Sequence, residues 1–100
     1  MPAYFYMMAS RPDGVLYCGS CNNIAQRVQQ HRSRKGSVFV SRFNVFRLVY
    51  LERFDTTAEA ILREKRIKKW NRAWKVELIE TANPEWDDLS SRLNDILPFD

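Results

Sequence analysis

Residues 17–31 of the chain read YCGSCNNIAQRVQQH, which is the pattern of a strand, a turn and a helix in succession. Residues 15–17 are β-formers at the end of a strand, and Gly19-Ser20 is expected to break that strand. Asn22 or Asn23 can cap the following helix by accepting a hydrogen bond from a free backbone N–H group. The segment therefore predicts a strand-turn-helix unit.

The helix of this unit is expected to extend to about Arg32 and to have two distinct faces. Ile24 and Val28 are four residues apart and form an apolar stripe. Arg27 and His31 have the same spacing, so their side chains stack on one face. A tyrosine, an arginine and the only histidine of the chain thus converge within one short unit.

Length and composition indicate one globular domain over residues 1–100. The chain has 100 residues, of which 45% are hydrophobic. No apolar run approaches the roughly 20 residues that a membrane-spanning helix needs, and no signal-peptide pattern opens the chain. Two cysteines without an export signal fit the reducing cytoplasm, where we expect the protein to reside.

The net charge of +4 is distributed unevenly along the chain. No acidic residue occurs from Gly14 to Leu51. From Arg63 to Lys75 there are seven basic residues and one acid, whereas the segment from Glu77 to Asp100 has seven acids and one base. A basic body favours a polyanionic partner, although charge that serves only solubility would give the same composition.

The segments on either side of the unit predict further strands. Ala3–Ala9 is apolar and aromatic, and the Arg11-Pro12-Asp13-Gly14 turn, with glycine permitting a positive φ, would return the chain as a hairpin. Residues 43–54 form the longest β-rich run. Because both of its faces are apolar, we expect a central strand that is covered on two sides.

The C-terminal half predicts helices. Thr56 or Thr57 would cap a helix that extends to about Trp70, and Asn71 separates it from a second helix over about 72–81. Asn83-Pro84-Glu85 looks like a third helix start, followed by apolar residues at helical spacing. Together these elements predict one α+β domain.

Several of these residues form a recognisable series. Tyr4-Phe5-Tyr6 and Tyr17-Cys18-Gly19, followed by Arg27, His31, a helical Glu64 and Asn83-Pro84, resemble the motif of the GIY-YIG nucleases. The resemblance covers residues 4–89 and is closest to the small stand-alone, single-domain bacterial members. Two positions depart from the pattern, because Tyr4 replaces the first glycine and Cys18 replaces the middle residue of the second triplet. Neither change removes a tyrosine hydroxyl.

The resemblance implies a fold and a mechanism. The fold would be a small three-stranded antiparallel sheet flanked by helices, and the activity would be metal-dependent hydrolysis of phosphodiester bonds in DNA. Tyr6 or Tyr17 would act as a base, which requires nearby positive charge to lower the tyrosine pKa. Arg27 and His31 would stabilise charge on the phosphate. One divalent ion, Mg²⁺ or Mn²⁺, would be held by Glu64.

Glu64 also has a simpler interpretation. Lys68 is its i+4 neighbour, and a helix-surface ion pair is worth only a few tenths of a kcal/mol. However, Glu64 projects between Ile61 and Ile67, into the sector that a helix usually buries. A carboxylate placed there needs a partner, and a metal would provide one.

The polyanion is expected to be DNA, bound without sequence specificity. Candidate phosphate contacts are Arg32, Arg34, Lys35, Arg42 and Lys68. Gly19 and Asn83 are expected to support the site, Asn83 as a helix cap and, by resemblance, as a residue near the active centre. We expect a monomer or weak dimer, no membrane association, and a possible protein partner that supplies specificity.

Two alternatives remain open at this stage. The same basic face could hold nucleic acid or a protein without cutting. Cys18 and Cys21 form a C-x-x-C pair, which suggests thiol redox chemistry if the helix start lowers a thiol pKa. A zinc site is disfavoured because His31 is the only other soft ligand.

Overall fold

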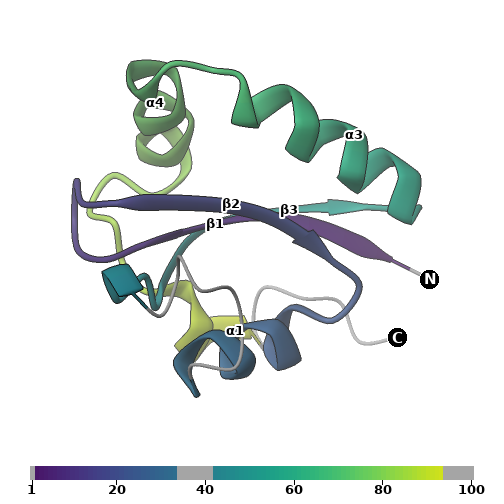
Figure 1. Ribbon diagram of the computed structural model, residues 1–100, viewed down its shortest axis with the longest axis horizontal. Helices are drawn as coiled ribbons and strands as arrows, with labels where there is room; N and C mark the ends of the chain where they lie inside the picture. The colour runs from purple at the N-terminus through teal and green to yellow at the C-terminus, as the bar shows by residue number, and fades with distance from the viewer. Residues whose placement is uncertain (1, 34–41, 94–100) are drawn as a thin grey trace.

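The structure is a computed structural model that describes residues 2–33 and 42–93. Strands β1 (Ala3–Ala9), β2 (Leu16–Cys21) and β3 (Arg47–Phe54) form an antiparallel sheet in the order β2-β1-β3. Helix α1 (Ile24–Arg32) covers one face, and α3 (Thr57–Lys68) with α4 (Arg72–Ala82) covers the other (Figure 1). This is the α+β fold that the resemblance implied.

The central strand is β1, not the segment that we expected. All seven residues of β1 are buried, and the strand pairs with a neighbour on each edge. The predicted run over residues 43–54 begins only at Arg47 as β3, and β3 lies at an edge of the sheet. Both faces of β3 are covered, as expected, but its polar Glu52 and Arg53 suit an edge strand better than a centre.

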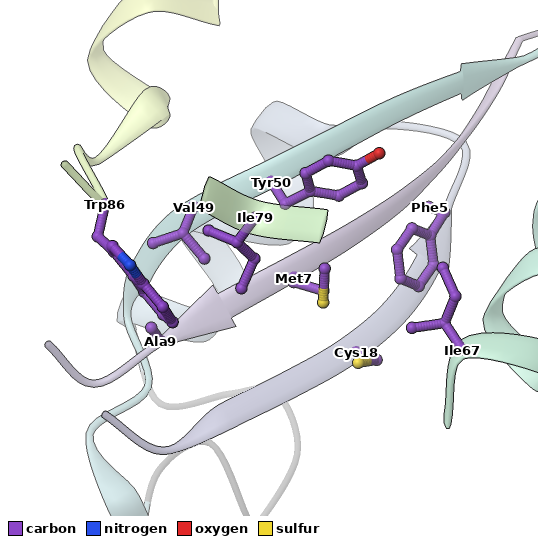
Figure 2. Packing of buried hydrophobic residues seen from close by; sticks show 9 residues of the cluster. All are labelled: Phe5, Met7, Ala9, Cys18, Val49, Tyr50, Ile67, Ile79 and Trp86. Atoms are coloured by element: carbon purple, nitrogen blue, oxygen red, sulfur yellow. The ribbon is translucent and has the colours of Figure 1, made fainter. Parts of the chain in front are cut away.

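Alternation along β1 divides the core into two clusters. Tyr4, Tyr6 and Met8 face α1, and the residues buried with them are Ile24, Val28, Val45, Leu48 and Leu93. Phe5, Met7 and Ala9 face α3 and α4, where they pack with Cys18, Val49, Tyr50, Ile67, Ile79 and Trp86. Figure 2 shows this second cluster, with Trp86 at one end and Ile67 at the other.

The hairpin forms as predicted but differs in two details. The residue with positive φ in the turn is Asp13 (56°), not Gly14, whose added Cβ would come within 2.4 Å of the Ser10 Oγ atom. Strand β2 also continues through Gly19 and Ser20, which we expected to end it. Cross-strand pairing of these residues with β1 outweighs their low strand propensity.

Side-chain caps set the helix starts. Asn23, not Asn22, caps α1 by accepting a bond from the Gln26 backbone N–H. Thr56 caps α3, and its hydroxyl also contacts Glu59 in a capping box. Asn71 caps α4, so the residue expected to interrupt the helix begins the next one.

The helix predicted after Asn83 is wrong. Asn83 instead ends α4 as its C-cap, and the structure has a short 3₁₀ helix at Leu89–Arg92, capped by Asp88. Between them, Trp86 has a φ of 56° and is only 3% exposed. Burial of this indole in the cluster beneath α4 outweighs the local helix signal.

Over the described ranges, none of the helices has the length and apolar character needed to cross a membrane.

Candidate active site

Four side chains named from the sequence come together on the α1 face of the sheet. Tyr6, Tyr17, Arg27 and His31 form what we call the tyrosine cluster. The ring centroids lie 6.3 Å apart for Tyr6 and Tyr17, 5.4 Å for Tyr17 and His31, and 5.8 Å for Tyr6 and His31. Tyr6 Oη lies 3.1 Å from His31 Nε2, and Arg27 Nη1 donates to the same oxygen at 3.4 Å.

Strand pairing explains why the two tyrosines share a face. In the β1–β2 register, Tyr6 lies opposite Gly19 and Met8 lies opposite Tyr17, so both phenols point toward α1. Gly19 is required here, because an added Cβ would lie 2.5 Å from Tyr6 Oη and 2.6 Å from its Cζ. Gly19 thus supports the site by making room for the Tyr6 ring.

Tyr6 and His31 form the buried part of the tyrosine cluster. They are 0% and 1% exposed. Burial raises the pKa of Tyr6, and burial together with the nearby Arg27 lowers the pKa of His31. Arg27 lowers the pKa of Tyr6, as positive charge is expected to do, but burial has the larger effect and the net shift is upward. His31 Nδ1 is the buried side-chain atom that lacks a hydrogen-bond partner within the described residues.

Tyr17 and Arg27 form the open part of the cluster, and both are half-buried. The phenol of Tyr17 interacts electrostatically with both Arg27 and Lys68. Tyr17 belongs to the edge strand β2 and packs against the core cluster beneath α1.

A second group, the carboxylate cluster, lies on the α3 face of β2. Ser20 Oγ donates to Glu64 Oε1 at 2.5 Å, and Lys68 Nζ lies 2.6 Å from Glu64 Oε2. The side chains of Glu64 and Lys68 are 20% and 51% exposed. Glu64 is thus partly buried, as predicted, although Ile61 beside it is 40% exposed.

Strand alternation explains the separation of the two clusters. Ser20 follows Gly19 directly, so its side chain points away from the tyrosines and toward α3. The pKa of Lys68 is raised, chiefly by its hydrogen bond to Glu64. The tyrosine cluster and the carboxylate cluster thus lie on opposite faces of the edge strand β2, and an electrostatic interaction between Tyr17 and Lys68 links them.

Comparison with known proteins identifies the family of this chain. Residues 2–77 match the model of the GIY-YIG catalytic domain. The chain belongs to the GIY-YIG family. It is 37% identical over 76 residues to a UPF0213 protein of Staphylococcus saprophyticus, covering 76% of this chain and 92% of that protein. It is 38% identical over 85 residues to a UPF0213 protein of Bacillus licheniformis, covering 85% and 87%.

A solved structure also resembles this GIY-YIG chain. The solution NMR structure of a UPF0213 protein from Bacillus halodurans aligns with a TM-score of 0.55 and 27% sequence identity, covering 88% of this chain and 93% of that one. GIY-YIG domains are in general endonuclease domains and typically use divalent metals. The chain therefore has a nuclease-like fold and is a small bacterial-type member of the family.

The donor atoms at Glu64 suit a metal of the kind that GIY-YIG domains use. Mg²⁺ is often bound by one or two carboxylates, with water and phosphate oxygens in its remaining positions. Glu64 offers one partly exposed carboxylate, and the hydroxyl of Ser20 lies beside it. A metal bound through Oε2 would replace the Lys68 ammonium. No group of three or more potential metal ligands occurs in residues 2–33 or 42–93, so a site here would rest on one carboxylate.

The residues of the GIY-YIG chain that were expected to bind phosphate have different surroundings in the structure. Arg32 is bonded to Asp88 and Ser90, both at the 3₁₀ helix, so its charge is already paired. The guanidinium of Arg42 lies 5.7 Å from the centre of the Phe43 ring. Arg34 and Lys35 lie outside the described residues. Lys68 is half exposed beside Glu64.

Asn83 has a structural role in this GIY-YIG chain. Its side-chain amide donates to the carbonyls of Val49 (3.0 Å) and Asp87 (2.9 Å), and its oxygen accepts from the Asp87 N–H. These bonds tie the end of α4 to β3, on the far edge of the sheet from β2. The structure therefore does not bring Asn83 together with the tyrosine cluster.

The C-x-x-C pair does not form a redox centre in this GIY-YIG structure. Cys18 is buried in the cluster beneath α3 and α4, whereas Cys21 packs against the cluster beneath α1. Three residues along a strand place two side chains on opposite faces. Burial raises the pKa of Cys18 and raises that of Cys21 to about 11, which is opposite to the activation that a redox thiol needs.

The bond from Ser20 to Glu64 was not predicted from the sequence, because Gly19-Ser20 was expected to end the strand. The available signal was the position of Ser20 next to Gly19: had the strand been continued, alternation would have put Ser20 on the face opposite the tyrosines.

Proposed function

We propose that this protein is a divalent-metal-dependent endonuclease that hydrolyses phosphodiester bonds in DNA. The observation that carries the proposal is the presence of the tyrosine cluster and the carboxylate cluster on the two faces of one edge strand, β2, in a chain of the GIY-YIG family. A phosphate at this edge would find a guanidinium, a phenol and a carboxylate from three different elements. That set of groups suits in-line attack of water on phosphorus.

The two tyrosines have different roles in this proposal. We assign Tyr17 as the substrate-facing tyrosine, because it is half-buried and interacts electrostatically with both Arg27 and Lys68. As the phenolate, its Oη would orient the attacking water and accept a proton from it as the P–O ester bond breaks, and the departing oxygen would take a proton from solvent. Tyr6 is a positioning residue. Its phenol holds Arg27 against the site and is itself held by His31.

The charged groups act on the phosphate. The guanidinium of Arg27 makes a single long bond of 3.4 Å to Tyr6, which leaves other N–H groups to donate to phosphate oxygens. Glu64 would hold the divalent ion, with Ser20 orienting its carboxylate. When bound, the ion supplies charge stabilisation at the phosphate and an activated water.

The substitution Glu64→Gln tests the proposal, because it removes the anionic ligand with almost no change in volume. The fold should survive, since glutamine is a good helix former and can still accept from Ser20. DNA affinity should stay constant or rise as one negative charge is lost. Metal-dependent cleavage should fall by orders of magnitude, because metal charge stabilisation is worth several kcal/mol.

A matched control is Glu85→Gln, which removes one negative charge from an exposed position after α4. Melting temperature, DNA affinity and cleavage of duplex, nicked, branched and single-stranded DNA, with and without Mg²⁺ or Mn²⁺, should be measured for both variants. Full activity of Glu64→Gln would overturn the metal-ligand role and most of this mechanism.

One observation favours a second candidate, a module that binds DNA without cutting it. Both oxygens of Glu64 already have partners, in Ser20 and Lys68. If the Lys68 pair persists in solution, metal cannot compete for the carboxylate. Wild-type protein that binds DNA but cuts none of the substrates with either metal would establish this alternative.

A further inference from the structure

A pocket separate from the two clusters lies between α4, the junction of α3 with α4, and strand β3. Its volume is about 440 Å³, which lies in the range of small-molecule sites. Its walls include Tyr50 of β3, Trp70 at the junction, and Trp74, Glu77, Leu78 and Thr81 of α4. We call it the tryptophan pocket. It faces β3, whereas Glu64 and Lys68 face β2.

The aromatic walls of the tryptophan pocket are held in place. The rings of Trp70 and Trp74 meet edge to face, with centroids 6.1 Å apart. The guanidinium of Arg63 lies 5.5 Å from the centre of the Trp70 ring and is fixed by two bonds to Glu52. The hydroxyl of Tyr50 donates to the same carboxylate. Preset aromatic faces lower the entropy cost of binding a flat ligand.

Trp74 is exposed beyond what packing requires. The side chain is 57% exposed, the highest value among the large apolar residues that are exposed in the described ranges. An exposed indole beside a pocket offers a face on which a flat ring can stack.

The chain segment that carries the two tryptophans indicates the kind of ligand. Both tryptophans lie within the basic segment from Arg63 to Lys75. Lys65, Arg66, Lys69 and Lys75 have no carboxylate within 4 Å among the described residues, unlike Arg63, Lys68 and Arg72 of the same segment. A basic segment that also supplies two tryptophans to a pocket has the features that bind unpaired nucleotides, in which bases stack on aromatic rings and phosphates are neutralised by cations.

The single acid of the pocket fits the same ligand. Glu77 lines the pocket, and a carboxylate can accept hydrogen bonds from the amino groups of a base edge. An apolar peptide would leave the four unpaired cations without a counterpart. Charge complementarity therefore favours nucleic acid over a protein segment.

We propose that the tryptophan pocket binds an unpaired nucleobase of a single DNA strand, stacked on Trp74, with a neighbouring phosphate on Lys69. This inference goes beyond the proposed cleavage and does not depend on it, because stacking needs neither Glu64 nor a metal. It assigns a class of ligand: DNA that carries an unpaired segment.

The experiment measures the binding of a fluorescently labelled oligodeoxycytidine, whose bases carry amino groups, and of a duplex of equal length by anisotropy, in EDTA so that no cleavage occurs. Trp74→Ala should weaken single-strand binding by roughly five- to a hundredfold and leave duplex binding nearly unchanged. Trp74→Phe should retain most of the affinity. Leu62→Ala, which removes an exposed apolar side chain of α3 outside the pocket, should have no effect.

A second measurement makes the assignment specific. If a base occupies the pocket, an oligonucleotide with abasic sites should bind the wild type as weakly as the intact strand binds Trp74→Ala, and the two losses should not add. Glu64→Gln should show the same pattern as the wild type, so failure of the nuclease proposal would leave this result intact. Unchanged single-strand affinity in Trp74→Ala, which a protein-binding pocket would also give, or an equal loss for duplex, would overturn the inference.

Discussion

At the scale of single residues, burial gives Tyr6 and Tyr17 different chemistry. Both phenols point toward α1, but Tyr6 is completely buried against Gly19 and His31. Its raised pKa keeps it neutral at physiological pH. His31, whose pKa is lowered, is neutral as well. In the proposed mechanism, the pair is therefore a neutral support for Arg27, and Tyr17 is the base.

Replacing each tyrosine by phenylalanine should separate these roles. Tyr17→Phe should lower the cleavage rate by about 10²–10⁴-fold, the usual worth of a positioned acid–base group, with little change in stability. Tyr6→Phe should lower the free energy of unfolding by about 1–3 kcal/mol, because His31 Nε2 and Arg27 lose a buried partner. Single-turnover cleavage and urea unfolding would measure both effects.

A stable but inactive Tyr6→Phe, together with an active Tyr17→Phe, would exchange the two assignments.

At the scale of elements, the turn that follows α4 is held by a side chain rather than by helix hydrogen bonds. Asn83 satisfies two backbone carbonyls and one N–H, which joins α4, β3 and the turn at Trp86. Arg47 adds a bond from β3 to the carbonyl of Trp86. Such a buried amide replaces the partners that an irregular segment would otherwise lack.

Asn83→Ala should therefore be a stability variant. Loss of three hydrogen bonds at a residue only 6% exposed should lower the free energy of unfolding by about 2–3 kcal/mol. Asn71→Ala, which removes an exposed helix cap, is the control and should cost about 1 kcal/mol. Cleavage by the folded fraction of Asn83→Ala should match the wild type. Loss of cleavage in a fully folded Asn83→Ala would place Asn83 in the active site.

At the scale of the whole molecule, the two proposed functional clusters lie on opposite faces of the sheet, and strand β2 contributes residues to both. The tyrosine cluster occupies one face, and the carboxylate cluster occupies the other. Helices α3 and α4, which carry most of the basic segment from Arg63 to Lys75, lie on the carboxylate side of the sheet (Figure 1). We infer that DNA approaches across this helical side and reaches Tyr17 at the edge.

This charge arrangement predicts a steep dependence of DNA affinity on salt. If Lys65, Arg66, Lys69 and Lys75 each neutralise one phosphate, affinity should fall about a hundredfold between ~50 and ~200 mM salt. Lys69→Ala should reduce the slope of log K against log[salt] by about one. Arg32→Ala should change it less, because Asp88 already pairs with Arg32. A slope near zero for the wild type would leave the positive charge with no role in binding DNA.

The sequence by itself determined the local elements and the family. Strand Ala3–Ala9, the start of α1, the Thr56 cap and the division between α3 and α4 at Asn71 agree with the structure. These features depend on alternation, helical spacing and capping, which act between residues a few positions apart. The order of motif residues from Tyr4 to Glu64 was enough to indicate the GIY-YIG family.

Only the tertiary structure decided the strand order, the burial of Tyr6 and His31, the bond from Ser20 to Glu64, the turn at Trp86 and the tryptophan pocket. Each depends on contacts between segments far apart in the chain. Cross-strand pairing carried β2 through Gly19 and Ser20, and burial of Trp86 prevented a helix after Asn83. In both places the free energy of packing exceeds the small local preferences that a sequence pattern can express.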